Sequence, residues 1–405
     1  MKPRIAIYFL IGGSILLPLL WQGCQQKTQA QPTAPDRREL LEFAFASAET
    51  LPLDPHHKDR ARAQQQVVEG CIASKLPEQG LQYARKIRNW RRGAAIAELA
   101  IYHARIGQAA QSKQLQIEAR QIADLHNGWR RDEILVRLMR ARGILQDREA
   151  ATELLGEFSE PEAAGQVAAT VGLITQDQTP MQAAESLRGQ IASAAEKRLF
   201  DLTRNLLFSA ARLLEEHYSD ADLRVYLAES IEQGMAAGRI PIFIRIELLL
   251  ELSETASAAG DSEAASEWMT KAQTLKDGSR WPLRFGIGIT ARLAEGWQGA
   301  GQAEKADALF AASLNQFNDN LEKIQNFDRA EILRTIAESL VDSGRAAQAR
   351  EVYSQAVEQG AVNPNLRPRA EDLVATAVSM ATTGVLPDRS LWSRMRQIRE
   401  SLGDR

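Results

Sequence analysis

With 405 residues, 44% hydrophobic side chains and a formal net charge of −3, the chain suits two or three ordinary domains or one long repeat array. The near-neutral charge argues against a nucleic-acid-binding protein, which normally carries a basic surplus. Its two cysteines cannot form a disulfide framework.

The chain begins with the pattern of a targeting segment. Two cations precede an apolar run over residues 5–21, and a small residue stands directly before Cys24. This pattern resembles a bacterial lipoprotein signal, which implies a signal peptide over residues 1–23 and a lipid on Cys24. An ordinary secretory signal cleaved after Ala30 and an uncleaved membrane anchor stay open as alternatives. Each of the three places the remainder of the chain outside the cytoplasm.

A polar segment with two prolines follows, and we expect a flexible tether over residues 24–37. The folded part is then expected over residues 38–405. Its first helix is predicted from Arg38 to Thr50, because Pro52 and Pro55 come directly after it.

Helix-forming residues dominate the remainder, and β-hairpin turn signals are missing, so the expected fold class is all-α. Turn signals divide residues 58–400 into helical hairpins. In the fifth hairpin the helices are predicted from Glu196 to Tyr218 and from Leu223 to Gln233, and a helix from Asp388 to Leu402 is expected to cap the array. The predicted turns lie near Leu76-Pro77, Gly107, Gln146-Asp147, residues 177–180, Ser219-Asp220, Gly260, Gly301, Gly344 and Gly384.

Residues 327–359 show the repeated unit most clearly. Each of its two helices carries an apolar stripe at helical spacing, and the turn at Gly344 separates them. One such pair cannot bury both stripes, so it needs copies of itself on either side.

The first helix of four pairs opens with an aromatic residue, any residue, and Arg. The copies are residues 90–92, 129–131, 243–245 and 327–329. The helix dipole disfavours a cation at this end. We therefore expect each Arg to pair with an acid on the neighbouring hairpin or to stack on the aromatic ring.

Gly344, Ala349, Tyr353 and Ala356 are spaced as in tetratricopeptide repeats, which this part of the chain resembles. The period is nearer 40 residues than the usual 34, so the similarity is to a tetratricopeptide-like (TPR-like) array. The resemblance implies an α-solenoid of about nine helical hairpins over residues 38–405.

No catalytic motif accompanies the repeats, since the sequence has no HExxH, Walker loop or GxSxG elbow. Nothing near His56 and His57 in the sequence clearly supplies the further ligands that a metal site needs. Gly286 and Gly288 match part of a dinucleotide fingerprint, but their helical context favours close helix packing. Cys71 lies on an apolar stripe, which favours a buried thiol. We therefore expect a non-enzymatic protein without catalytic residues, metal or other cofactor.

In the family that the chain resembles, the first helix of each pair lines a concave groove. That register would place a set of charged residues in the groove, which we call the acidic strip: Glu247, Glu254, Glu295, Glu331, Arg334, Glu338 and Asp342. The carboxylate clamp of the family uses Lys and Asn at these places, so capture of a peptide C-terminus is not expected. The strip is expected to bind a cationic or donor-rich segment of a protein partner. The alternative is a solvated charged face.

Together these patterns predict a lipid-anchored, protein-binding scaffold in the bacterial cell envelope, facing the periplasm or the exterior. An accessory factor or enzyme acting on cell-wall glycan or exported polysaccharide is the alternative. Self-association through an exposed end of the array is a third interpretation.

Overall fold

The computed structural model describes residues 34–159 and 179–403. All regular structure in these two ranges is helical, so the predicted all-α class is confirmed. Residues 1–33, with the predicted signal peptide, Cys24 and most of the tether, lie outside the described residues. Residues 160–178, with most of the fourth predicted hairpin, lie outside them as well.

The described residues form 18 α-helices. Seven precede residue 160: α1 (Arg37–Glu49), α2 (Leu53–Ala73), α3 (Pro77–Ala84), α4 (Arg91–Arg105), α5 (Ala109–Ala123), α6 (Trp129–Ile144) and α7 (Arg148–Leu155). The others follow residue 178: α9 (Pro180–Glu196), α10 (Phe200–Glu216), α11 (Ala221–Ala237), α12 (Ile242–Ala258), α13 (Ser262–Asp277), α14 (Leu283–Gly299), α15 (Ala303–Asp319), α16 (Asn326–Asp342), α17 (Ala346–Ala361), α18 (Leu366–Thr383) and α19 (Arg389–Gly403). None of these helices is both long and apolar enough to cross a membrane.

Consecutive helices pack as hairpins, as the repeat pattern predicts: α2–α3, α4–α5, α6–α7, α10–α11, α12–α13, α14–α15 and α16–α17. Four of the turns place glycine in the left-handed region, for example Gly344 with φ of 77° and Gly260 with φ of 79°. The predicted glycine-free turn has the same conformation, with Gln146 at φ of 57°. Glycine suits this position because a Cβ atom there crowds the following carbonyl oxygen.

Replacing Gly344 with Ala is expected to lower the free energy of unfolding by about 1–2 kcal/mol. An added Cβ would meet no atom within 4 Å other than those of Gly344 and its two chain neighbours, so the loss comes from the local backbone conformation alone. The matched variant Gln146→Gly should cause no loss, because glycine adopts this conformation readily. Chemical denaturation measures both variants, and an unchanged midpoint for Gly344→Ala would contradict the left-handed turn.

The fifth hairpin begins later than predicted. Its first helix is Phe200–Glu216, because the chain makes a turn at Arg198, whose φ is 57°. That turn separates α10 from α9, which begins at Pro180 as the proline predicts. Helix α9 packs on both α10 and α11, so these three helices form one unit.

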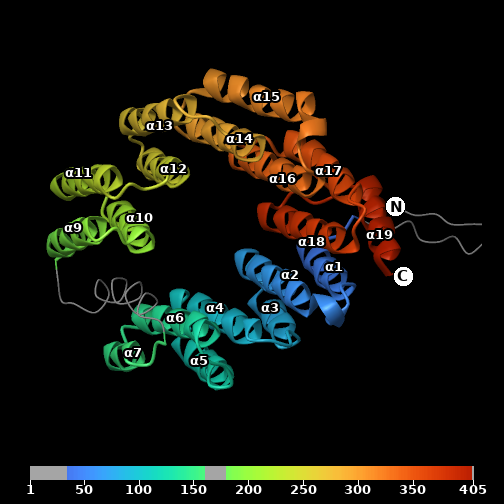
Figure 1. Ribbon diagram of the computed structural model, residues 1–405, viewed down its shortest axis with the longest axis horizontal. Coiled ribbons are helices and arrows are strands. Elements are labelled where there is room, and N and C mark those ends of the chain that lie inside the picture. Colours follow the sequence, from blue (N-terminus) through green and yellow to red (C-terminus); the bar gives the residue numbers. More distant parts are fainter. Residues whose placement is uncertain (1–33, 160–178, 404–405) are drawn as a thin grey trace, which may run out of the picture. The chain divides into compact units, whose positions relative to one another are not determined.

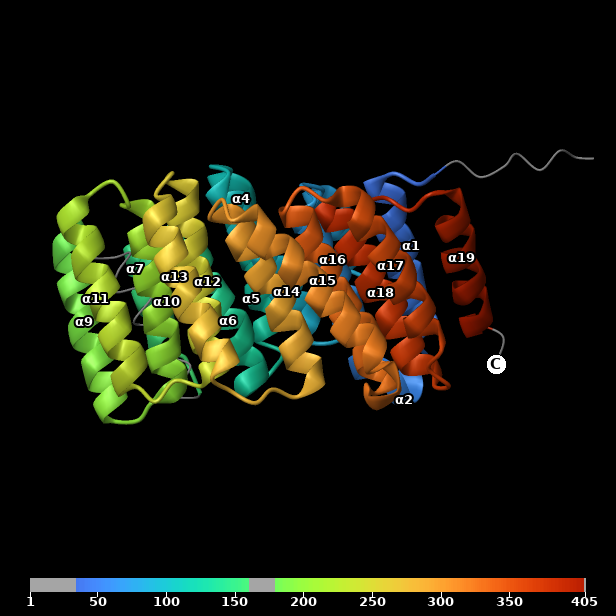
Figure 2. The same cartoon turned by 90° about the horizontal axis from the view of Figure 1, so that it is seen from above.

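The first helices of successive hairpins pack side by side into what we call the first-helix layer. Its order by contact is α10, α12, α14, α16, α18, α2, α4 and α6. Aromatic residues at the starts of neighbouring first helices meet, as Phe243 and Phe285 do with ring centroids 6.0 Å apart, and Trp90 and Trp129 at 5.2 Å. The first helices therefore run parallel, with their N-termini along one edge of the layer and their C-termini along the other (Figure 2).

The two ends of the described chain meet in this layer. Helix α18 packs on α2, and α1 packs closely along α18 (Figure 1). Helix α1 also packs on α2, just as α17 packs on α18 and α5 on α6. It therefore holds the place of the second helix in the pair that α18 begins. The sequence pattern pairs α18 with α19 across Gly384, but the main partner of α18 is α1.

Small residues allow this close approach. A Cβ atom added to Gly70 of α2 would lie 2.7 Å from Val378 Cγ1 of α18 and 3.1 Å from Leu41 Cδ2 of α1. Helix α19 completes the junction, because Trp392 packs edge-on against Phe43 of α1 with ring centroids 4.8 Å apart. The last helix is thus a cap, as predicted, and part of what it covers is the first described helix.

A continuous apolar core runs from Leu40 to Leu402, within one compact unit, Ala34–Arg405. Cys71 is fully buried in it, and burial raises the pKa of this thiol to about 12. The buried thiol that the sequence predicts is confirmed. The glycines of α14 are less closely packed against other helices than predicted: a Cβ added to Gly286 would lie 3.0 Å from Trp281, in the connection before the same helix, and one added to Gly288 would lie 3.5 Å from Thr335 of α16.

Candidate functional site

Ion pairs link successive first helices along the layer. Arg292 Nη1 of α14 lies 3.1 Å from Glu247 Oε1 of α12. Arg334 Nη1 of α16 lies 3.0 Å from Asp372 Oδ1 of α18, and both of these side chains are largely buried. Two members of the acidic strip, Glu247 and Arg334, therefore hold neighbouring helices together.

Glu331 has the same role at the junction of α14 and α16. Arg284 Nη1 lies 3.1 Å from Asp328 Oδ1, and its Nη2 lies 3.7 Å from Glu331 Oε1. The Arg284 guanidinium also lies 5.0 Å from the ring centroid of Phe285. This cation thus makes both contacts expected of an Arg at a helix entry: an acid on the next hairpin and an aromatic ring.

The other four strip residues form a group that we call the carboxylate cluster. Glu254, Glu295 and Glu338 each occupy the thirteenth position of their helix, in α12, α14 and α16, and Asp342 ends α16. None of the four makes an ion pair with Lys or Arg within the described part of the chain. Because parallel helices place equal positions side by side, the cluster repeats along the first-helix layer.

The acids of the cluster act on one another electrostatically. Burial raises the pKa of Glu295 to about 7, although a hydrogen bond with Ser339 opposes this change. The negative charges of Asp342 and Glu254 raise it further, while the cation of Arg292 lowers it. A partly buried carboxyl group among like charges is therefore poised between its two protonation states near neutral pH.

Glu338 connects the cluster to a buried chain of hydroxyl groups. Ser379 Oγ donates to Glu338 Oε1 at 2.5 Å, and the Tyr353 hydroxyl lies 2.7 Å from Ser379 Oγ and 3.2 Å from Thr383 Oγ1. Because Ser379 uses its single proton on Glu338, Tyr353 donates to Ser379. The sequence did not indicate this network, since Ser379 belongs to no motif and Tyr353 fits an apolar stripe.

Replacing Glu295 with Gln is expected to raise stability at about pH 8 by about 1–3 kcal/mol. The folded-state pKa of about 7 lies above the ordinary value of 4.5. Ionised Glu295 therefore costs stability as the pH rises through this interval, and Gln removes that cost. At about pH 4.5 the gain should vanish, because the wild-type group is then protonated in the folded state.

Urea denaturation at both pH values measures this difference, and Glu254→Gln is the control at the same helix position. Glu254 is exposed, so its replacement should change stability little. An equal gain for Glu295→Gln at the two pH values would contradict an electrostatic origin.

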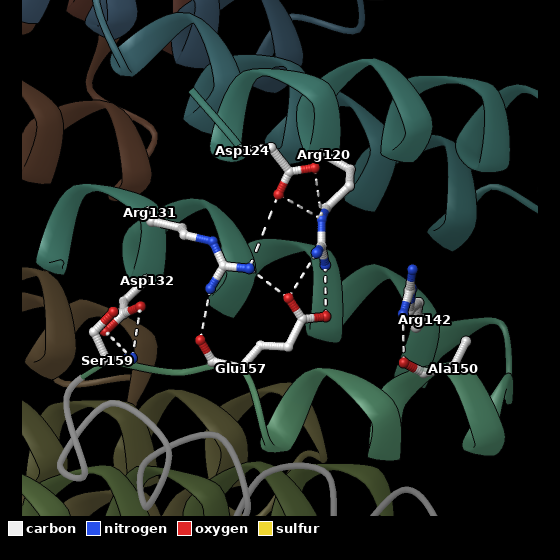
Figure 3. A network of polar contacts seen from close by, with 8 residues as sticks. All are labelled: Arg120, Asp124, Arg131, Asp132, Arg142, Ala150, Glu157 and Ser159. Atoms are coloured by element: carbon white, nitrogen blue, oxygen red, sulfur yellow. Dashed lines mark hydrogen bonds and ion pairs between the residues drawn. The ribbon is translucent and has the colours of Figure 1, made fainter. Parts of the chain in front are cut away.

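The recurring Arg at the helix entries has different partners in different copies. In α6, Arg131 Nη1 donates to the Glu157 carbonyl oxygen at 2.6 Å, and its Nη2 pairs with the same residue's carboxylate (Figure 3). Arg120 of α5 donates to that carboxylate at 2.8 and 2.6 Å and lowers its pKa. Asp132 accepts from the Ser159 backbone N–H. Arg131 Nη2 also lies 3.9 Å from Asp124 Oδ1, at the end of α5 on the neighbouring hairpin, so the predicted pairing of Arg131 is confirmed. Glu157 belongs to Arg131's own hairpin, and its contacts fasten the segment after α7 onto α5 and α6.

In α16 the predicted pairing of the entry Arg with an acid on the neighbouring hairpin is wrong. Arg329 of α16 donates to the carbonyl oxygen of Ile324 at 3.0 Å, in the connection that precedes its own helix. The stacking residue also differs from the prediction: Arg91, not Arg92, lies over the Trp90 ring at 4.7 Å. Helical periodicity explains this, because the residue next to the aromatic sits closer to the ring than the residue two positions on.

Matching residues at matching positions thus recur from hairpin to hairpin. The chain is an all-helical repeat protein. No family model and no curated protein sequence matches it. Among solved structures, this repeat protein is similar to a circular tandem repeat protein with novel repeat topology and enhanced subunit contact surfaces. Their sequence identity is 16%, the match covers 90% of this chain and 94% of that chain, and the TM-score is 0.25.

The chemistry that the carboxylate cluster offers is negative charge and hydrogen-bond acceptors. Within residues 34–159 and 179–403, no group of three or more His, Cys, Asp or Glu side chains could hold a metal ion. His56, for which the sequence favoured no metal site, has its Nδ1 3.4 Å from Asp59 Oδ2.

Proposed function

We propose that this repeat protein is a non-enzymatic scaffold of the bacterial cell envelope, anchored by a lipid on Cys24. The carboxylate cluster binds a protein partner through a segment that is cationic or rich in hydrogen-bond donors. The observation that carries this proposal is the repetition of Glu254, Glu295 and Glu338 at one position of three parallel helices. A row of acids at helix spacing matches an extended segment with several cations better than it matches one small molecule.

The proposal implies that binding depends on pH. A cation beside Glu295 favours its ionised form, so the bound state has a lower pKa than the value of about 7 in the free protein. Binding then releases a proton, and affinity rises as the pH rises through about 7. A neutral apolar partner would produce the opposite trend, because it would bury the carboxyl group further.

Charge reversal at Glu254 and Asp342 tests the proposal. Both residues are exposed, so Glu254→Lys with Asp342→Lys should leave the fold intact. We expect binding of an oligolysine peptide, and crosslinking to the natural partner in native membranes, to weaken at least about tenfold at low salt. Fatty-acid labelling of Cys24 tests the anchor separately.

The matched control is Glu304→Lys with Glu351→Lys, on second helices α15 and α17, where both side chains are also exposed. This control changes the net charge equally and should retain binding. Equal loss in both double variants would show that net charge alone matters, and unchanged binding in the Glu254 and Asp342 variant would leave the cluster a solvated face.

A further inference from the structure

One edge of the first-helix layer collects exposed apolar side chains. We call it the entry edge, because second helices end there and the next first helices begin. Twelve large hydrophobic side chains are exposed among the described residues, and nine of them lie on the entry edge: Leu53, Leu125, Trp129, Leu199, Phe200, Ile242, Phe285, Phe327 and Val362. The exposed fraction reaches 74% for Leu125 and 54% for Phe327. Single exposed apolar side chains are normal on a protein surface, but here nine of twelve gather along one edge.

The same edge is cationic, although the whole chain has a net charge of −3. Each connection on this edge can be counted together with the first four residues of the helix that follows it. These eight segments contain 17 Lys and Arg but 6 Asp and Glu: residues 50–56, 85–94, 124–132, 197–203, 238–245, 278–286, 320–329 and 362–369. At the opposite edge, each connection from a first helix to the next helix in the chain, from α2–α3 to α18–α19, is counted in the same way with four helical residues. These segments contain 6 Lys and Arg and 9 Asp and Glu. The two edges therefore differ in the sign of their charge.

Many entry-edge cations have no acidic partner among the residues that the structure describes. They are exposed and make no ion pair with an acid among the described residues: Arg88, Arg130, Lys197, Arg198, Arg239 and Arg280. Arg130 lies 5.1 Å from the ring centroid of the exposed Trp129, so a cation and an aromatic side chain are presented together. Unpaired cations therefore alternate with exposed apolar side chains along the entry edge. A partner that suits both kinds of side chain offers anionic groups and an apolar medium.

We propose that the entry edge docks onto the surface of an anionic lipid bilayer. Lys and Arg would contact lipid phosphate groups, while the aromatic and aliphatic tips enter the boundary between headgroups and acyl chains. This contact goes beyond the proposed scaffold, because it orients the array on the membrane and leaves the carboxylate cluster for a protein partner.

The distribution of the apolar residues distinguishes a bilayer from other occupants. They are spread over seven connections, from α1–α2 to α17–α18, instead of forming one patch of the size that a protein partner covers. A soluble polyanion would neutralise the cations but leave the nine apolar side chains in water. A lipid surface offers phosphate groups to the cations and an apolar medium to the apolar side chains along the whole edge.

Vesicle flotation with residues 34–405 tests this docking. This portion is a compact unit with its own core, and it contains neither Cys24 nor the apolar leader. We expect it to float with vesicles of phosphatidylcholine and phosphatidylglycerol, to release at high salt, and to stay unbound with phosphatidylcholine alone. Flotation with both vesicle types, or with neither, would overturn the proposal.

Two variants separate the cationic and apolar contributions. Arg88→Glu with Arg280→Glu should weaken vesicle binding at least about tenfold, whereas Arg105→Glu with Lys113→Glu, away from the edge, should not. Leu125→Ser with Phe327→Ser should weaken it several-fold and make the remaining binding more sensitive to salt. Its control is Ile117→Ser with Val225→Ser, which removes apolar side chains of similar exposure, 62% and 56%, away from the entry edge.

Equal losses in an edge variant and its control would overturn the proposal. So would binding of soluble dextran sulfate without binding of anionic vesicles, since that result assigns the edge to a polymer. The Glu254→Lys and Asp342→Lys variant should float like the wild type, so failure of the scaffold and failure of the docking are distinguishable.

Discussion

Removing α1 is expected to unfold the junction between the two ends of the chain. A protein that begins at Pro52 should show a large drop in melting temperature and rapid amide exchange in α18 and α2. This is the largest stability effect that we expect from the fold, because α1 supplies the second helix of the pair that α18 begins.

The size of the effect follows from the apolar side chains that α1 and the two residues after it bury. Leu40, Leu41, Phe43, Phe45 and Leu51 are all at most 3% exposed. Each such side chain contributes about 1.5–3 kcal/mol on burial, so their sum rivals the 5–15 kcal/mol stability typical of a folded protein. Their removal also uncovers the apolar faces of α18 and α2, which then lack a partner.

A synthetic peptide of residues 34–51 provides a rescue test. If α1 acts as a separate piece that completes the α18 pair, the peptide should restore protection of α18 in the shortened protein. The variant Glu42→Ala, on the exposed side of α1, should behave like the wild type. An unchanged melting temperature after removal of residues 34–51, with slow exchange in α18, would show that α19 alone completes the pair.

Breaking the buried ion pair between α16 and α18 is expected to have the second-largest effect. Replacing Arg334 with Met should lower the free energy of unfolding by about 3–5 kcal/mol at neutral pH. Side-chain exposure is 13% for Arg334 and 9% for Asp372, so the variant leaves a buried carboxylate without its cation. The loss of the Arg334 hydrogen bond to Thr376 at 3.3 Å adds to this cost.

The pH dependence identifies the cause. Burial already raises the pKa of Asp372, while Arg334 opposes that change, so the pKa should rise further in Arg334→Met. The penalty should therefore shrink as the pH falls and Asp372 is protonated. The double variant Arg334→Met, Asp372→Leu should recover most of the stability, because it removes both buried charges. Denaturation of the single and double variants measures this, and an equal loss in both would point to lost packing instead of an unpaired charge.

The local features of the fold follow from the sequence for simple physical reasons. Left-handed turns favour glycine, so Gly107, Gly260, Gly301 and Gly344 mark where hairpins reverse. Apolar spacing identifies the buried faces, and Cys71 is buried where its stripe predicts. The predicted start of α10 is wrong for an equally local reason. The left-handed residue in that turn is Arg198, and arginine is not a residue type that marks a turn in a sequence.

The candidate site was predicted only in part. Helical register brought Glu254, Glu295 and Glu338 to one position of successive helices, as the acidic strip requires. The helical register could not show that Glu247, Glu331 and Arg334 form ion pairs with residues on neighbouring helices, because those partners lie about forty residues away in the sequence. It also could not find Ser379, whose role depends on a contact between α16 and α18.

The sequence by itself determined that this protein is an array of helical hairpins, because turn residues and apolar periodicity act within a few residues of the chain. The tertiary structure decided which helices complete one another. The partner of α18 is α1, more than three hundred residues earlier, and no local pattern distinguishes α1 from α19 as its companion. The physical reason is that apolar stripes of similar width fit many neighbours, and only the three-dimensional packing around Gly70 selects among them.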